Sequence, residues 1–229
     1  MSSNRLTVLD RLALRILRIS LGRPVRIAVD GRTASGKTTL SAELGTVLER
    51  SGRRVIRTSI DGFHRPKIER YARGRHSAEG YYYDSRDLAA ITTLLLEPLG
   101  PSGDRFYRTA SFDLDNDVPV ALAPVLAPSD AVLVVDGTFL QRPELRDGWD
   151  LVIFVETSEK ISQARGVLRD SGRLGGTDAA ETIYAGRYRS AFALYDRACR
   201  PEQTADVVFN NNDVDRPVVR IRQGGRLPD

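Results

Sequence analysis

The feature that most constrains this chain is the octapeptide Gly31–Thr38, which reads Gly-Arg-Thr-Ala-Ser-Gly-Lys-Thr. It fits the pattern G-x-x-x-x-G-K-[ST] at every position. An apolar segment, 24–29, precedes it, and the stretch 38–50 repeats leucine and valine at helical spacing. Backbone amides in a glycine-rich turn at the start of a helix form a cradle for phosphate oxygens. The sequence therefore predicts a phosphate-binding loop between a strand and a helix.

This loop supplies the predicted nucleotide-binding residues, which are Gly31, Thr33, Ala34, Ser35, Gly36, Lys37, Thr38 and Thr39. Lys37 is one of only three lysines in the 229 residues, and its ammonium would reach the β- and γ-phosphates of ATP. The Thr38 hydroxyl would bind Mg²⁺, which takes a few oxygen ligands and keeps several waters.

Apolar runs that alternate with helical patterns predict the fold class. The strands are expected at 24–29, 55–60, 131–135, 151–155, 206–209 and 218–221. Helices are expected at 38–50, 87–97, 158–170 and 179–200, and an amphipathic N-terminal helix at 5–21. This alternation predicts one α/β domain over residues 1–229, with a mostly parallel central sheet flanked by helices, as in P-loop NTPases.

Two segments break the alternation. Residues 61–84 are rich in Gly, Arg, Tyr and His and show no periodicity, and residues 100–130 contain four prolines. The second segment suggests a small hairpin of 105–112 with 118–125. Long irregular segments in a compact domain are usually functional, and ligands of such folds bind outside the carboxyl ends of the strands. We expect both segments to lie on the acceptor side of the site, where a compound that receives the phosphoryl group would bind.

Two aspartates follow predicted strands. Asp61 comes at the end of the second strand, where it could take the proton of an attacking hydroxyl. Asp136 ends the apolar run 132–135, the usual position of a carboxylate near Mg²⁺. Each also fits an ordinary Asp-Gly turn.

The segment 165–178 is predicted to be an arginine-bearing lid. Arg165 and Arg169 lie on a helix there and could neutralise charge on the polyphosphate, although a solvated basic helix face explains them equally well. Tyr83 and Asp84 end a tyrosine cluster that either binds an acceptor hydroxyl or packs in the core.

Composition limits the other possibilities. The chain has 34 Lys and Arg against 30 Asp and Glu, without a long basic run, so nothing argues for nucleic acid beyond a pI of about 9.4. Cys199 is the only cysteine, which favours a reducing compartment, and the longest apolar runs are far shorter than a membrane span. We expect a cytoplasmic protein, and the sequence leaves a homo-oligomer open.

Taken in order, these segments resemble the uridine kinase, phosphoribulokinase and bacterial pantothenate kinase group of P-loop kinases. The resemblance rests on Gly31–Thr39, Asp61–His64, Tyr83-Asp84, Val135–Gly137, Leu145–Asp147, Asp150–Val155, Val167–Asp170 and Ala205–Val208. It covers roughly residues 24–212, most of the chain.

The resemblance implies ATP and Mg²⁺ as cofactors, and it implies roles for individual residues. The catalytic residues would be Asp61 as base, Lys37 and Arg169, with Thr38 and Asp136 at the metal and Arg165 and Arg169 in the lid. The acceptor would contact Asp61, His64, Tyr83, Asp84 and Tyr107. The chain departs from uridine kinases in two places. It has no histidine after Tyr107, where 109–112 reads Thr-Ala-Ser-Phe, and its lid has Leu-Gly-Gly at 174–176 in place of further arginines.

The sequence thus predicts an ATP-dependent kinase that phosphorylates a hydroxyl of a small metabolite. A nucleoside such as uridine or cytidine is the leading acceptor, and pantothenate or a sugar is the alternative. Two other classes remain open, a slow nucleotide-dependent switch and a nucleic-acid-dependent ATPase. The Asn-Lys-x-Asp motif of GTPases does not occur in the chain.

Overall fold

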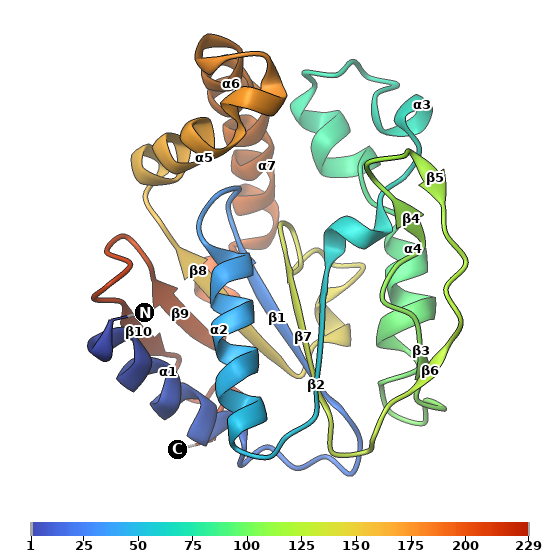
Figure 1. Ribbon diagram of the computed structural model, residues 1–229, viewed down its shortest axis with the longest axis vertical. Coiled ribbons are helices and arrows are strands. Elements are labelled where there is room, and N and C mark those ends of the chain that lie inside the picture. Colours follow the sequence, from blue (N-terminus) through green and yellow to red (C-terminus); the bar gives the residue numbers. More distant parts are fainter. Residues whose placement is uncertain (1, 229) are drawn as a thin grey trace.

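A six-stranded sheet forms the centre of the structure, a computed structural model that describes residues 2–228 (Figure 1). The strands are β1(Val25–Gly31), β2(Val55–Ser59), β7(Val132–Gly137), β8(Leu151–Glu156), β9(Val207–Asn210) and β10(Val218–Ile221). Their spatial order is β10-β9-β8-β1-β7-β2, and every neighbouring pair is parallel except β10 with β9. The predicted mostly parallel sheet is confirmed.

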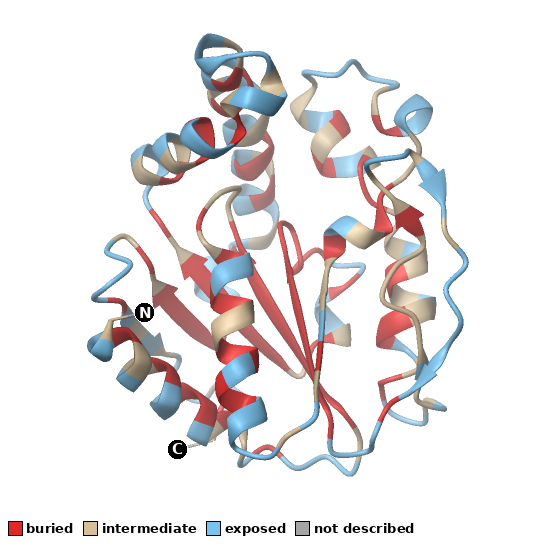
Figure 2. Cartoon of the chain, in the orientation of Figure 1, coloured by how far each residue is buried: buried red, intermediate tan, exposed pale blue. Residues whose placement is uncertain are grey.

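The central strands are apolar throughout because both faces of the sheet are covered. Successive residues alternate between two cores: Val152 packs with helices on one face, and Ile153 packs on the other. The first face holds α4(Leu88–Ile91) and α7(Arg189–Cys199), and the second holds α1(Ser3–Ile16) and α2(Lys37–Arg50). Figure 2 shows the resulting band of buried residues along the sheet.

The remaining helices lie mostly around the upper edge of the sheet in Figure 1. They are α3(Lys67–Arg70), α5(Glu159–Leu174), α6(Thr177–Ile183) and α8(Pro201–Thr204), with single 3-10 turns at η1(Ile60–Phe63) and η4(Arg146–Gly148) and π-helical turns at η2(Gly80–Asp84), η3(Thr92–Leu96) and η5(Tyr184–Tyr188). The predicted long helix 179–200 is present as α6, η5 and α7 in succession. None of the described helices is both long and apolar enough to cross a membrane.

The N-terminal helix is shorter than predicted. The Ser2 hydroxyl accepts a hydrogen bond from the Arg5 amide and starts α1, which ends at Ile16 and not at residue 21. The chain then turns back toward β1 through Gly22, whose φ of 66° suits glycine, and through Pro24. Ile19, beyond the end of the helix, is also buried, which is why the apolar pattern in the sequence extends past Ile16.

The two segments on the acceptor side are more ordered than their sequence indicates. Residues 61–84 contain three short helical turns, η1, α3 and η2. The predicted hairpin is present as two separate two-residue ladders, β3(Phe106–Tyr107) with β6(Val125–Leu126) and β4(Phe112–Asp113) with β5(Val118–Pro119). The prolines explain why pairing is interrupted, since proline has no amide to donate.

Candidate active site

A cleft of about 470 Å³ opens at the carboxyl ends of β1, β2 and β7. The phosphate loop forms its floor, and the turn after β2 and the end of β7 form one wall. The segment 64–86 and the tip of the hairpin form the acceptor side, and α5 and η5 close the cleft from the lid side. This is the place where α/β sheets bind ligands.

The phosphate loop has the backbone that its glycines predict. Gly36 has a φ of 96°, and a Cβ there would lie 2.4 Å from Asn211 Nδ2. A Cβ on Gly31 would lie 2.7 Å from the Val155 carbonyl oxygen. At Gly31 a side chain would collide with backbone, and at Gly36 the positive φ as well as the contact with Asn211 disfavours one, so glycine is favoured at both positions.

The loop fits an anionic ligand on two structural grounds. Helix α2 begins without a side-chain cap and without an acidic residue in its first turn, so its first amides are left for a ligand. In addition, the buried Ser35 hydroxyl has no hydrogen-bond partner among the described residues. These features suit the phosphate groups of ATP.

Lys37 is the buried cation of the loop. Its Nζ donates to the Arg32 carbonyl at 2.7 Å. Burial lowers the pKa of Lys37 to about 8, and the carboxylates of Asp30 and Asp136 oppose that shift. The phosphate oxygens of a bound nucleotide would place negative charge beside this buried ammonium and stabilise its charged form.

Thr38 and Asp136, the two residues predicted to bind Mg²⁺, are in direct contact. The Thr38 hydroxyl donates to Asp136 Oδ2 at 2.7 Å. Burial raises the pKa of Asp136, and the Thr38 hydrogen bond and Lys37 act in the other direction. Mg²⁺ needs only a few protein oxygens because it keeps several waters, so a hydroxyl and a carboxylate side by side fit such an ion.

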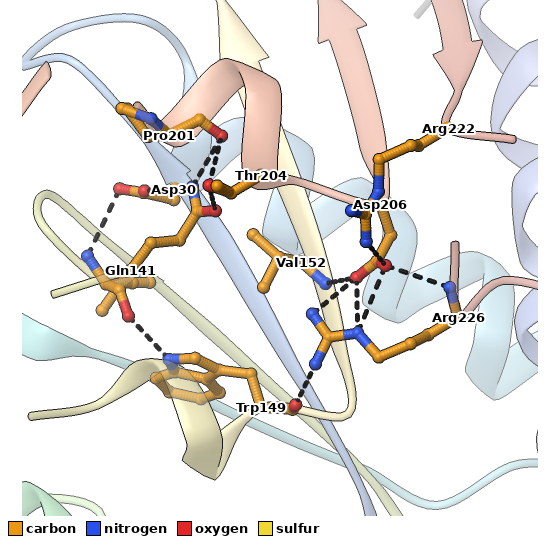
Figure 3. A network of polar contacts seen from close by, with 10 residues as sticks. Asp30, Gln141, Trp149, Val152, Pro201, Thr204, Asp206, Arg222 and Arg226 are labelled. Atoms are coloured by element: carbon orange, nitrogen blue, oxygen red, sulfur yellow. Dashed lines mark hydrogen bonds and ion pairs between the residues drawn. The ribbon is translucent and has the colours of Figure 1, made fainter. Parts of the chain in front are cut away.

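A buried polar network supports the start of the loop (Figure 3). Asp30 is fully buried and accepts hydrogen bonds from the Gly31 amide at 2.8 Å, from Gln141 Nε2 at 2.9 Å and from the Tyr195 hydroxyl. Burial raises the pKa of Asp30, while the bonds from Tyr195 and Gln141 lower it. Because Tyr195 lies on α7, the network fixes the phosphate loop to that helix.

Asp61 faces the cleft next to a buried arginine. Arg86 Nη2 lies 2.6 Å from Asp61 Oδ1, and Arg86 Nη1 lies 2.5 Å from His64 Nε2. Desolvation raises the pKa of Asp61, but Arg86 and the other nearby groups, among them Lys37, together outweigh it, and the net pKa lies below the ordinary value. Asp61 is therefore held as a carboxylate.

His64 is a neutral part of this cluster. Burial and then Arg86 lower the pKa of His64 to about 3. Because Arg86 can only donate, Nε2 must accept, so the proton lies on Nδ1 and is donated to the Asp61 carbonyl at 2.9 Å. His64 thus fixes the backbone of Asp61.

The lid arginine is held by a neighbouring carboxylate. Arg169 donates to both oxygens of Asp170 at 2.9 Å, and Asp170 also accepts from Tyr184 at 2.6 Å. Desolvation raises the pKa of Asp170, but the bonds from Arg169 and Tyr184 lower it, and the net pKa lies below the ordinary value. Asp170 therefore stays ionised. Both Arg169 and Arg173 line the cleft.

The structure brings most of the predicted site together and leaves four residues outside it. Thr33, Ala34, Lys37, Thr38, Asp61, His64, Asp136 and Arg169 line the cleft, and Gly31, Ser35, Gly36 and Thr39 belong to the same loop or its helix. Arg165, Tyr83, Asp84 and Tyr107 do not line it.

Each of these four has other contacts. Arg165 donates to the carbonyls of Asn211 and Asn212, and Asp84 pairs with Arg73 at 2.8 Å. Tyr83 packs against Tyr82, with ring centroids 4.7 Å apart. Tyr107 lies in the β3–β6 ladder and packs against the core. The positions of Asp84 and Tyr107 therefore do not support acceptor binding in this conformation.

Sequence reasoning missed the basic and aromatic residues of the acceptor side. These are Lys67, Arg70, Tyr71, Arg75, Tyr81, Arg86, Arg187 and Tyr188. Arg86 follows Asp84 by two residues, so the predicted motif pointed to the right segment, in which Arg86 lines the cleft and Asp84 does not. Arg187 had no signal, because it lies in an ordinary helical pattern.

Comparison with known proteins agrees with this geometry. The sequence profile of the phosphoribulokinase / uridine kinase family matches residues 26–215. A uridine kinase of Leuconostoc citreum is 27% identical over 156 residues, covering 68% of this chain and 72% of that protein. Uridine-cytidine kinase B of Dictyostelium discoideum is 28% identical over 154 residues, covering 66% and 60%.

A solved structure shows the same likeness. The structure of a possible uridine kinase from Bacillus stearothermophilus superposes with a TM-score of 0.69 at 25% identity, covering 87% of this chain and 96% of that one. Members of the matched family are phosphotransferases that act on a hydroxyl group. With its phosphate loop, its paired Thr38 and Asp136 and its cleft-facing Asp61, the chain belongs to the phosphoribulokinase / uridine kinase family.

Proposed function

We propose that this chain is a Mg²⁺–ATP-dependent kinase that transfers the γ-phosphoryl group to a hydroxyl of a small metabolite. The observation that carries the proposal is that Lys37, after β1, and Asp61, after β2, face one cleft at the same edge of the sheet, close enough to interact electrostatically. The first would bind the terminal phosphates, and the second would receive the attacking hydroxyl.

The loop residues 31–39 would bind the polyphosphate through backbone amides, and Lys37 would neutralise its terminal charge. Thr38 and Asp136 would hold Mg²⁺, which when bound offsets the charge of the phosphate oxygens. Arg169 would lie over the polyphosphate from the lid.

Asp61 would orient the acceptor. Its carboxylate accepts a hydrogen bond from the hydroxyl and takes the proton as the oxygen bonds to the γ-phosphorus and the bond from that phosphorus to the β–γ bridging oxygen breaks. ADP and the phosphorylated acceptor are the products. Catalysis of this kind comes mostly from positioning and electrostatics.

Two acceptor classes have support. The curated relatives are named as uridine or uridine-cytidine kinases, which favours a nucleoside. The basic lining of the acceptor side favours an alcohol that also carries an acid group, as pantothenate does. We place the enzyme in the cytoplasm, since Cys199 is its only cysteine.

Asp61→Asn tests the proposal. We expect turnover to fall by about 10²–10⁴, because the variant cannot accept the hydroxyl proton. ATP binding should persist, since the phosphate loop is unchanged. Product formation is measured by mass after incubation with Mg²⁺–ATP and a panel of nucleosides, pantothenate and sugars. Near-normal turnover in the variant, or an ATPase stimulated by nucleic acid and not by small alcohols, would contradict it.

A further inference from the structure

The acceptor side of the cleft carries positive charge that the phosphate chemistry does not use. Eight Lys and Arg side chains and four Asp side chains line the whole cleft, an excess of four positive charges. Asp117, just outside the lining, neutralises Arg70 at 2.7 Å. Mg²⁺–ATP brings about two net negative charges. At least one cation therefore remains for another ligand.

Arg187 is the strongest candidate for that cation. It lies in η5 on the lid side, and its guanidinium carbon is 4.8 Å from the ring centroid of Tyr81, 5.5 Å from that of Tyr71 and 5.7 Å from that of Tyr188. Within residues 2–228 it forms no ion pair, and its buried Nε has no hydrogen-bond partner. Three aromatic rings hold the guanidinium in place without neutralising it.

Other cations surround the same position. Arg75 lines the cleft and makes no ion pair with a described carboxylate. Lys67 also lines it, and the nearby Asp117 already binds Arg70 at 2.7 Å. Among the lining residues contributed by segment 64–86 and the hairpin tip, Asp115 is the one carboxylate, and it is exposed. The local field is positive.

This group of cations lies beside the proposed base. The guanidinium groups of Arg86 and Arg187 both contact the ring of Tyr81, at 5.8 and 4.8 Å from its centroid. Arg86 in turn binds Asp61. Two side chains in contact, Arg86 and Tyr81, thus link Asp61 to Arg187, and both ends line the same cleft, so a single small molecule can present a hydroxyl to the first and an acid group to the second.

We infer that Arg187, with Lys67 and Arg75, forms an anion-binding subsite, and that the preferred acceptor is an alcohol bearing a carboxylate or phosphate group. This rests on the proposed kinase function and narrows its acceptor. A planar guanidinium recognises both groups through paired hydrogen bonds. Neutral nucleosides would leave the subsite unfilled and be the weaker substrates.

The test compares Arg187→Gln with wild type in two measurements. In turnover assays with Mg²⁺–ATP, the acceptors are uridine and cytidine as neutral alcohols, pantothenate and glycerate as carboxylates, and ribulose 5-phosphate as a phosphate. We expect an acid-bearing acceptor to have the highest kcat/KM. Arg187→Gln should raise its KM by about 10- to 100-fold and leave the KM for ATP nearly unchanged.

Arg197→Gln is the matched control, because Arg197 is exposed on α7 and does not line the cleft. The second measurement is calorimetric binding of the same compounds with Mg²⁺ and a non-hydrolysable ATP analogue present, so that the phosphate loop is occupied. Binding of an acid that Arg187→Gln abolishes supports the subsite, whether or not turnover follows. Uridine as best substrate, or equal affinity in Arg187→Gln, overturns the subsite while leaving the kinase proposal intact. Failure of ATP itself to bind overturns the kinase proposal.

Discussion

Asp61 and Arg86 show how one contact sets the state of the proposed base. Arg86 is buried and pairs with Asp61, which lowers the pKa of that carboxyl. The sequence pointed to Asp61 because it follows a strand, but nothing near it in sequence indicated Arg86, which is 25 residues away.

Replacing Arg86 tests this pairing. Arg86→Met keeps the bulk and removes the charge, so the pKa of Asp61 should rise toward its ordinary value. Since the reaction needs the carboxylate, kcat/KM falls as pH drops through that pKa, and the acidic limb of the profile should move to higher pH. Arg73→Met, which affects an exposed arginine outside the cleft, is the control. An acidic limb that stays in place or moves to lower pH would show that Arg86 does not act on Asp61.

Lys37 gives a second pH-dependent expectation. Burial lowers the pKa of its ammonium to about 8. ATP affinity should fall as pH rises through about 8, by up to tenfold per pH unit, because the neutral amine binds phosphate poorly. Titration of binding against pH checks this, with Lys37→Met as a weak-binding variant without that dependence. Constant affinity across the alkaline range in wild type would contradict it.

At the scale of elements, α7 and β1 are joined through the buried Asp30. The Tyr195 hydroxyl donates to Asp30 and accepts a hydrogen bond from the backbone amide of Gln141 at 2.9 Å. Tyr195→Phe leaves both partners without this hydroxyl and should lower the free energy of unfolding by about 1–3 kcal/mol in urea denaturation. Tyr83→Phe, at an exposed ring, should change it by less than about 0.5 kcal/mol. Equal stability of Tyr195→Phe and wild type would show that the Tyr195 hydroxyl does not stabilise the fold.

The strands were predictable because burial on both faces leaves continuous apolar runs, as at 132–135 and 151–155. The tyrosine cluster was not. In the π-helical turn η2 successive side chains point in different directions, and Tyr81 lines the cleft while Tyr83 and Asp84 do not. The aperiodic stretch 61–84 gave no sign that it forms such turns.

At the scale of the whole molecule, the sheet gathers segments that are distant in sequence. The phosphate loop, the turn after β2 and the end of β7 meet because parallel strands share one carboxyl edge. This half of the site was therefore predictable, because the sequence indicates parallel strands and shows which residues follow them. The acceptor half depends on how η2, α3 and η5 pack against one another, and no local pattern encodes that packing.

The central claim is that the phosphate loop holds ATP with its terminal phosphate directed at Asp61. A crystal structure with Mg²⁺ and a non-hydrolysable ATP analogue tests it most directly. We predict the polyphosphate within residues 31–39, the ion at Thr38 and Asp136, and the γ-phosphate between Lys37 and Asp61. An empty loop, or a nucleotide whose terminal phosphate points away from Asp61, would contradict the account.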